Sequence, residues 1–336
     1  MLVFASASDA SAPEHNRPRV CRGSVSVLVR LRRWRSQGQP ILIMPRLLLL
    51  CVLLLPLLAL GPRGDRPAYR LFTAQGQAAD YDQMLAQLAT ADVVLFGEQH
   101  NDPIAHWLEL QVAQDLNRLK GPGKLVLGLE MFERDVQPLL TQYTAGTLPD
   151  SAFERQSRPW PNYATDYRPV LAFAQQAHLP VVATNVPRRY AQQVARGSLA
   201  ALGQLPANEK AYMMPLPLTV DYALPGYQKM AAMFGGAGAH GSSSQNIIQA
   251  QAIKDATMAY SIRQNLKPGQ TLLHLNGSFH SDNHDGIASY LKMGKPALKM
   301  LTISTVSQNQ LQTLDKESVG LADYVLVVPA DMTKTY

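Results

Sequence analysis

The amino-acid sequence predicts an α/β protein with a mostly parallel central sheet, helices on both faces and a smaller helical subdomain formed by inserts. Six segments are continuous apolar runs rather than alternating ones, which is typical of strands buried on both faces. Helical patterns lie between several of these segments, and such alternation favours a parallel sheet covered on both sides. The six predicted strands are 92–98, 124–132, 179–187, 270–277, 297–304 and 323–329.

The predicted helices cover 81–89, 104–119, 167–177 and 246–264. Two longer segments interrupt the alternation. The first, 134–166, contains QSRPWPNYATDYRP, and the second, 197–245, mixes Pro, Met and Tyr with a Gly/Ser-rich tail. With the helix that follows, the second region runs to about residue 265. Long irregular segments in a compact domain are usually functional, so we expect the inserts to form a small helical subdomain, or lid, above the sheet.

The positive charge of the chain is concentrated near its beginning. Ten of the 31 Lys and Arg residues, but three of the 25 Asp and Glu residues, lie in residues 1–66, so the remainder is close to neutral. This distribution argues against a nucleic-acid partner. An apolar run of 14 residues, 47–60, follows Met44-Pro45-Arg46, as in a secretory signal, and is short for a membrane span. We therefore expect 1–43 to be an upstream extension, 44–64 a signal peptide or N-terminal anchor, and 65–336 an exported domain.

Both cysteines, Cys21 and Cys51, fall in this leader, so the expected domain has none. Cys51 lies inside the apolar run rather than after it, which argues against a lipid-modified cysteine. Any metal ion in the domain must therefore be held by His, Tyr, Met or carboxylate side chains.

Polar residues follow the predicted strands where each strand ends. Glu98 and His100 end the first strand, Glu130 ends the second and His280 ends the fourth. Ligands of parallel α/β sheets bind beyond the carboxyl ends of the strands, so we expect these four side chains to gather at one rim. They suit either acid/base catalysis or a metal site with His100, Glu130 and His280 as ligands.

Two Gly-x-x-His segments frame this rim, and Gly97 and Gly277 would each allow a tight turn after a strand. Any one of the four polar groups alone is more often a satisfied structural side chain, but four at corresponding strand ends favour a site. His106 is interpreted as a solvated or packed histidine. His284 is one turn from His280 only if the segment is helical, and Asp255 either points at the rim or packs within its helix.

The ordered segments LFGEQHND, LGLEMFERD, WPNYATDYRPVLAFA, LPVVATNVPR, QAQAIKDATMA and LNGSFH resemble the ChaN haem-binding lipoproteins over roughly residues 80–292. These belong to the wider Tiki/TraB-like group, which is also likened to erythromycin-esterase-type folds. The resemblance implies an α/β core with a helical subdomain, and a role in haem or iron acquisition at the periplasm or outer membrane. Haem is the implied cofactor, and an outer-membrane haem receptor and a second copy of the chain are the implied partners.

In the Tiki branch, two Gly-x-x-His motifs and a glutamate form a metal-dependent hydrolase site. Here the resemblance places that site at Gly97/His100, Gly277/His280 and Glu98 or Glu130, with a divalent metal as the cofactor. For haem, the expected contacts lie in and near the inserts, where Tyr or His can hold iron axially; core packing is the alternative for each aromatic residue. They are Tyr163, Tyr167, Tyr227, Met230 and His240. Haem binding and metal-dependent hydrolysis of peptides or esters are thus the two leading hypotheses, and a partner-binding surface protein is the third.

Overall fold

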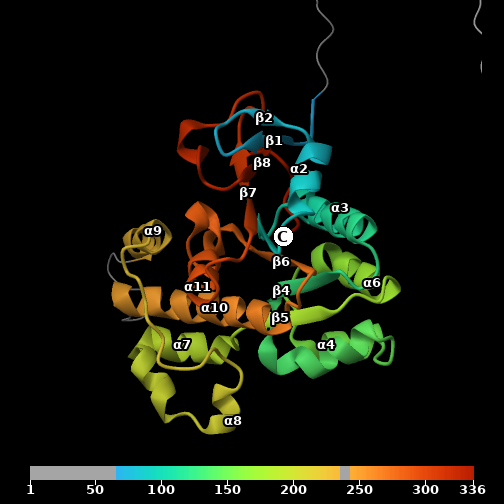
Figure 1. The fold of residues 1–336 in the computed structure, drawn as a ribbon. Coiled ribbons are helices and arrows are strands. Elements are labelled where there is room, and N and C mark those ends of the chain that lie inside the picture. Colours follow the sequence, from blue (N-terminus) through green and yellow to red (C-terminus); the bar gives the residue numbers. More distant parts are fainter. Residues whose placement is uncertain (1–65, 235–242) are drawn as a thin grey trace, which may run out of the picture. The chain divides into compact units, whose positions relative to one another are not determined.

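The computed structural model describes residues 66–234 and 243–336, which contain one eight-stranded sheet (Figure 1). Strands β3 to β8 are parallel wherever they pair, whereas β1 pairs antiparallel with β2 and β8. The predicted mostly parallel α/β fold is therefore confirmed. In the order in which they lie in the sheet, the strands are β2 (Ala78–Ala79), β1 (Arg70–Thr73), β8 (Tyr324–Pro329), β7 (Met300–Gln308), β3 (Val93–Glu98), β6 (Thr271–Gly277), β4 (Leu125–Glu133) and β5 (Val181–Asn185).

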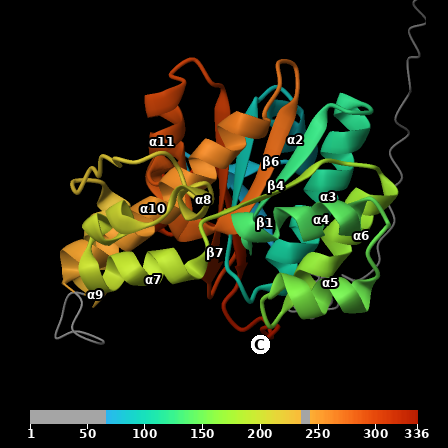
Figure 2. The same cartoon turned by 90° about the horizontal axis from the view of Figure 1, so that it is seen from below.

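Helices cover both faces of this sheet (Figure 2). One face carries α2 (Tyr81–Leu88), α3 (Pro103–Lys120), α4 (Gln137–Thr144), α5 (Asp150–Ser157), the π-helical turn η2 (Tyr163–Tyr167) and α6 (Arg168–Gln176). The other carries α7 (Arg188–Gly197), η3 (Leu199–Gln204), α9 (Pro225–Phe234), α10 (Ser244–Asn265) and α11 (Ile287–Gly294), while the short α8 (Ala207–Lys210) precedes α9. No helix within these described residues is both long and apolar enough to span a membrane.

The central strand β3 shows why its sequence is apolar throughout. Val94 and Phe96 join the core beneath α2 to α6, and Val93 and Leu95 join the core beneath α10 and α11. Because successive side chains of a strand point to opposite faces, a strand covered on both sides needs apolar residues at every position. The same pattern ends abruptly at Gly97 and Glu98, where the chain leaves the sheet.

The helix that follows β3 is fixed at its first turn. The Asp102 carboxylate accepts hydrogen bonds from the backbone N–H groups of Ile104 and Ala105, at 3.0 and 3.1 Å, and Pro103 occupies the first helical position. Such an N-cap satisfies donors that the helix leaves unpaired. Lys334 also contacts Asp102, at 2.9 Å. The loop that carries His100 is therefore held between a strand and a capped helix.

The described residues of both inserts include helices. Residues of 134–166 form α4, α5 and η2, and several of their side chains, including Tyr143 and Phe153, enter the core on the α3 face of the sheet. The second insert supplies α9, whose Tyr227 packs in the core on the opposite face. The expected segments 1–43 and 44–64 lie outside the described residues.

The sheet edge at β5 is covered by one side chain of α4. The Gln137 amide donates to the carbonyl of Val181 at 2.9 Å and accepts from the N–H of Ala183 at 2.7 Å. These are the two bonds that the backbone of a neighbouring strand would otherwise make.

Candidate functional site at the carboxyl ends of the parallel strands

A cavity of about 500 Å³ opens where β3 and β6 end. Its apolar side is formed by Met230 and Met233 of α9 and by Phe279, of which the last two are 58 % and 41 % exposed. Its polar side is formed by the two Gly-x-x-His segments. The described residues that line it are Glu98, Gln99, His100, Asn101, Met230, Met233, Gln251, Gly277, Ser278, Phe279 and His280.

His100 lies on the wall of this cavity with its ring packed against Gly277. A methyl group on Gly277 would lie 2.6 Å from ring atoms Cε1 and Nε2, so this close approach requires glycine. Nδ1 lies 2.7 Å from Oε1 of Glu98, and the Trp160 ring meets the imidazole edge-on, with the centroids 4.8 Å apart. Burial lowers the pKa of His100, but the hydrogen bond with Glu98 and the charges of Glu130 and Glu98 outweigh it and raise the pKa.

His280 lies between two buried carboxylates. Its Nε2 is 3.1 Å from Oε1 of Glu130, and its Nδ1 contacts the carboxylate of Asp255 on α10. Burial opposes the charged imidazolium, but the two carboxylates dominate and raise the pKa of His280 to about 10. Burial also opposes ionisation of Glu130, but His280, His100 and the Gly277 N–H, which donates at 2.7 Å, hold the pKa of Glu130 well below its usual range. An imidazolium paired with two carboxylates follows from these contacts.

Two of the predicted haem contacts donate hydrogen bonds to a rim carboxylate or to a carboxylate that contacts the rim. Tyr227 of α9 donates to Oδ2 of Asp255 at 2.7 Å, and Tyr167 donates to Oε1 of Glu98 at 2.6 Å. Burial, followed by the neighbouring carboxylate charge, raises the pKa of both phenols far above the usual value. Each therefore serves as a neutral hydrogen-bond donor.

Of the remaining predicted haem contacts, Met230 and Tyr163 lie within the described residues and His240 does not. Met230 lines the cavity. Tyr163 is buried, with its ring against those of Phe132 and Phe153, at centroid distances of 6.3 and 6.0 Å. His240 falls in 235–242, outside the described residues.

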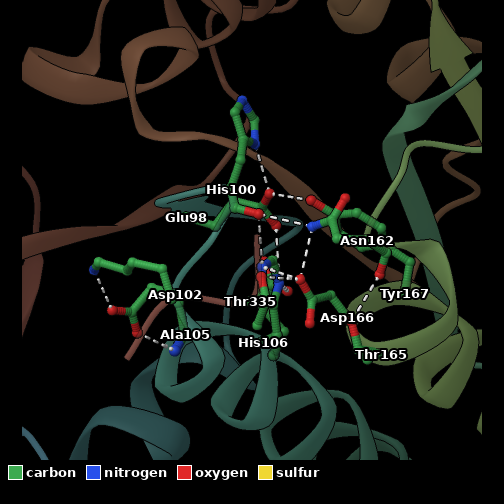
Figure 3. Close-up of polar contacts among 12 residues, drawn as sticks. Glu98, His100, Asp102, Ala105, His106, Asn162, Thr165, Asp166, Tyr167 and Thr335 are labelled. Carbon is green, nitrogen blue, oxygen red and sulfur yellow. Dashed lines mark hydrogen bonds and ion pairs between the residues drawn. The ribbon is translucent and has the colours of Figure 1, made fainter. Parts of the chain in front are cut away.

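A buried polar cluster extends from Glu98 to α3 and η2 (Figure 3). The Nδ1 atom of His106 is 3.0 Å from Oε2 of Glu109 and 3.5 Å from Oε2 of Glu98, and its Nε2 is 3.4 Å from Oδ2 of Asp166. Burial raises the pKa of Glu98 and of Glu109 to about 8, and the charge of a neighbouring carboxylate adds to the effect. Sequence reasoning assigned no site role to His106 and missed Glu109. The available signal was their spacing of three residues on a helix that begins just after a strand-end glutamate.

A sequence model described as haem-binding uptake, Tiki superfamily, ChaN matches residues 84–291. The chain belongs to this ChaN family. The solved structure of cofacial haem binding to ChaN of Campylobacter jejuni is 16 % identical, with a TM-score of 0.61, and the match covers 80 % of this chain and 100 % of that one. Its fold is thus the ChaN fold. No curated protein matches the chain.

Two further solved structures share lower similarity with this ChaN-family chain. The type III effector HopBA1 is 12 % identical with a TM-score of 0.41, over 74 % of this chain and 92 % of that one. An erythromycin esterase mutant in its open conformation is 14 % identical with a TM-score of 0.42, over 78 % and 84 % of the two chains.

The residues around the cavity fit the haem group that the ChaN family name implies. A flat tetrapyrrole needs an apolar wall, which Met230, Met233 and Phe279 provide. Its iron needs an axial donor such as His or Tyr. His100 has Nδ1 engaged by Glu98, and its Nε2 makes no hydrogen bond to a described residue. A carboxylate on one ring nitrogen is the usual support for a histidine that binds metal through the other.

Proposed function

We propose that this protein binds haem at the strand-end cavity and acts in haem or iron acquisition after export to the periplasm or outer membrane. The observation that carries the proposal is a cavity in which one side is apolar and the other presents a histidine with an unengaged ring nitrogen. Membership of the ChaN family supports the same ligand. An outer-membrane haem receptor and a second copy of the chain are the partners that we predict.

The apolar side of the cavity would cover the haem ring, and the polar side would bind its iron. Bound haem would supply an iron centre for transport. Met230, Met233 and Phe279 would cover the apolar face of the ligand and exclude water from it. Glu98 would orient His100, so that Nε2 faces the ligand. Lys229, whose Nζ lies 5.6 Å from the centroid of the Phe279 ring, would attract the carboxylate groups of haem.

A hemin titration of the purified chain, followed by its absorbance spectrum, tests this proposal. We expect a shifted Soret band that saturates with hemin, and a changed band in the variant that lacks the iron ligand. Two variants identify the residue that binds the haem iron. His100→Ala removes the iron ligand expected at the cavity, and His240→Ala removes the one expected in 235–242. A wild-type spectrum equal to that of free hemin would overturn haem binding altogether.

The second candidate function is metal-dependent hydrolysis, which is favoured by one observation. His100, Glu130 and His280, from three different strand ends, converge at the same rim as Glu98, the expected general base. A divalent metal held there would activate water, and it would have to replace Glu130 or Asp255 at a ring nitrogen of His280. Elemental analysis should then find near-stoichiometric metal that is lost in His100→Ala. Metal content that is negligible and equal in both proteins would exclude this candidate.

A further inference from the structure

A second group of ligand-type side chains lies on the α3 side of Glu98, and it shares only Glu98 with the rim formed by Glu98, His100, Glu130 and His280. Glu98, His106 and Glu109 are 1 %, 4 % and 0 % exposed. One nitrogen or oxygen atom from each of the three residues lies within 4.8 Å of the other two. Three convergent donors with this burial are rare away from a site, because burying ionisable groups is costly.

Both ring nitrogens of His106 face hydrogen-bond acceptors. Nε2 is 3.2 Å from the carbonyl oxygen of His100 and 3.4 Å from Oδ2 of Asp166, and both are acceptors. A metal ion bound at Nδ1 would leave the proton of the imidazole on Nε2, where these acceptors hold it. Nδ1 faces Oε2 of Glu109 and Oε2 of Glu98, at 3.0 and 3.5 Å, so a proton or a metal ion must lie between these atoms.

Two carboxylate oxygens of this group have no hydrogen-bond partner among the described residues. They are Oε2 of Glu98 and Oε1 of Glu109, and both are buried. Oε2 of Glu98 is directed into the cluster, since it lies 3.5 Å from Nδ1 of His106. Buried polar atoms are nearly always paired, so these atoms indicate either a bound cation or a proton shared by the two carboxyl groups.

No lysine or arginine within 66–234 and 243–336 neutralises the cluster. The nearby Lys334 pairs with Asp102 instead, at 2.9 Å. Among the described residues, Glu98 and Glu109 form ion pairs with histidines only. Three carboxyl groups, with Asp166 as the third, thus surround one imidazole. Charge of this kind in the interior requires a compensating cation or bound protons.

We propose that Glu98, His106 and Glu109 bind a divalent first-row transition metal ion, with Nδ1 of His106 and one oxygen of each glutamate as ligands. Mixed imidazole and carboxylate donors suit such ions. The contacts of Nε2 with a backbone carbonyl and with Asp166 are the outer-shell bonds that orient a metal-binding histidine. The ion would fix Glu98 and, through the 2.7 Å contact with Glu98, the position of His100. The proposal does not depend on haem binding.

Zinc is the probe that tests this site. The purified chain is stripped with a chelator, titrated with Zn²⁺ by calorimetry, and its retained metal is measured by elemental analysis. We expect one tightly bound equivalent, with binding weakened about 100-fold or more in His106→Gln and Glu109→Gln, since even outer-shell changes cost about 10–100-fold. The matched control is His284→Gln, because His284 also pairs with a carboxylate, Asp323, at 3.1 Å, and this variant should bind zinc normally.

A further variant, His280→Gln, separates this site from the rim. Zinc binding that survives in His280→Gln and disappears in Glu109→Gln supports the proposal, and the reverse overturns it. Equal zinc content in wild type and Glu109→Gln also overturns it. If wild type binds no zinc, and Glu109→Gln unfolds at the same denaturant concentration, protons rather than a metal compensate the cluster and the proposal is wrong. Circular dichroism of each variant confirms that it is folded.

Discussion

Substitution of Gly277 by alanine should displace His100 from the wall of the cavity. The added methyl group would lie 2.6 Å from Cε1 and Nε2 of His100, whereas ordinary contacts begin at 3.4 Å. The ring must therefore move by about 1 Å. This movement stretches the 2.7 Å contact between Nδ1 and Oε1 of Glu98 past the roughly 3.2 Å limit of a hydrogen bond. Because the side chain of His100 is 38 % exposed, water replaces part of the lost bond, and we expect the free energy of unfolding to fall by only about 1 kcal/mol.

The effect on ligand binding should be larger than the effect on stability. A ring displaced by about 1 Å no longer presents Nε2 to the ligand, so we expect the Kd for hemin to rise at least about tenfold, or about 1.4 kcal/mol. Hemin titration and urea denaturation measure the two effects separately. Gly203→Ala is the matched control, since nothing lies within 4 Å of the added methyl group. Equal hemin affinity in the two variants would refute the role given to His100.

Three other substitutions test the rim and its supports. Tyr227→Phe should lower the free energy of unfolding by about 1–3 kcal/mol, because the buried carboxylate of Asp255 loses a donor; an unchanged urea midpoint would mean that Asp255 has found another. His280→Gln should remove a pH-dependent part of the stability. The pKa of His280 is raised from 6.5 to about 10 on folding, so the advantage of wild type over this variant should be complete below pH 6.5 and vanish as the pH rises through 10; an advantage that grows with pH would contradict the ion pairs. Met230→Ser should weaken hemin binding several-fold by placing a hydroxyl in the apolar wall, and an unchanged Kd would show that the ligand lies elsewhere.

The central fold could be predicted because its strands are buried on both faces. A run such as Val93 to Phe96 has no polar position, and that pattern alone identifies a covered parallel strand. The antiparallel strands β1 and β2 were not predicted, since RLFT is short and begins with an exposed arginine. Tertiary pairing with β8, rather than local sequence preference, makes this segment a strand.

The meeting of Glu98, His100, Glu130 and His280 at one rim could also be predicted, because the carboxyl ends of parallel strands share one edge. The hydrogen-bond and ion-pair partners of these residues could not be predicted, since helices that pack on the sheet carry those partners. Asp255 reaches His280 only because α10 packs across the sheet. His106 and Glu109 reach Glu98 only because α3 returns along the strand that precedes it. Sequence spacing within one element does not report distances between elements.

The Gln137 side chain forms hydrogen bonds with two backbone groups on the outer edge of β5. A strand from another molecule would need the carbonyl of Val181 and the N–H of Ala183 to begin its ladder, and both are already engaged. At the opposite edge, β2 has two residues, too few to serve as a template for fibre growth. Any contact between copies must therefore use side-chain surfaces, since the joining of sheets from one molecule to the next is disfavoured. This arrangement protects the folded chain from extending into an amyloid-like filament at high local concentration.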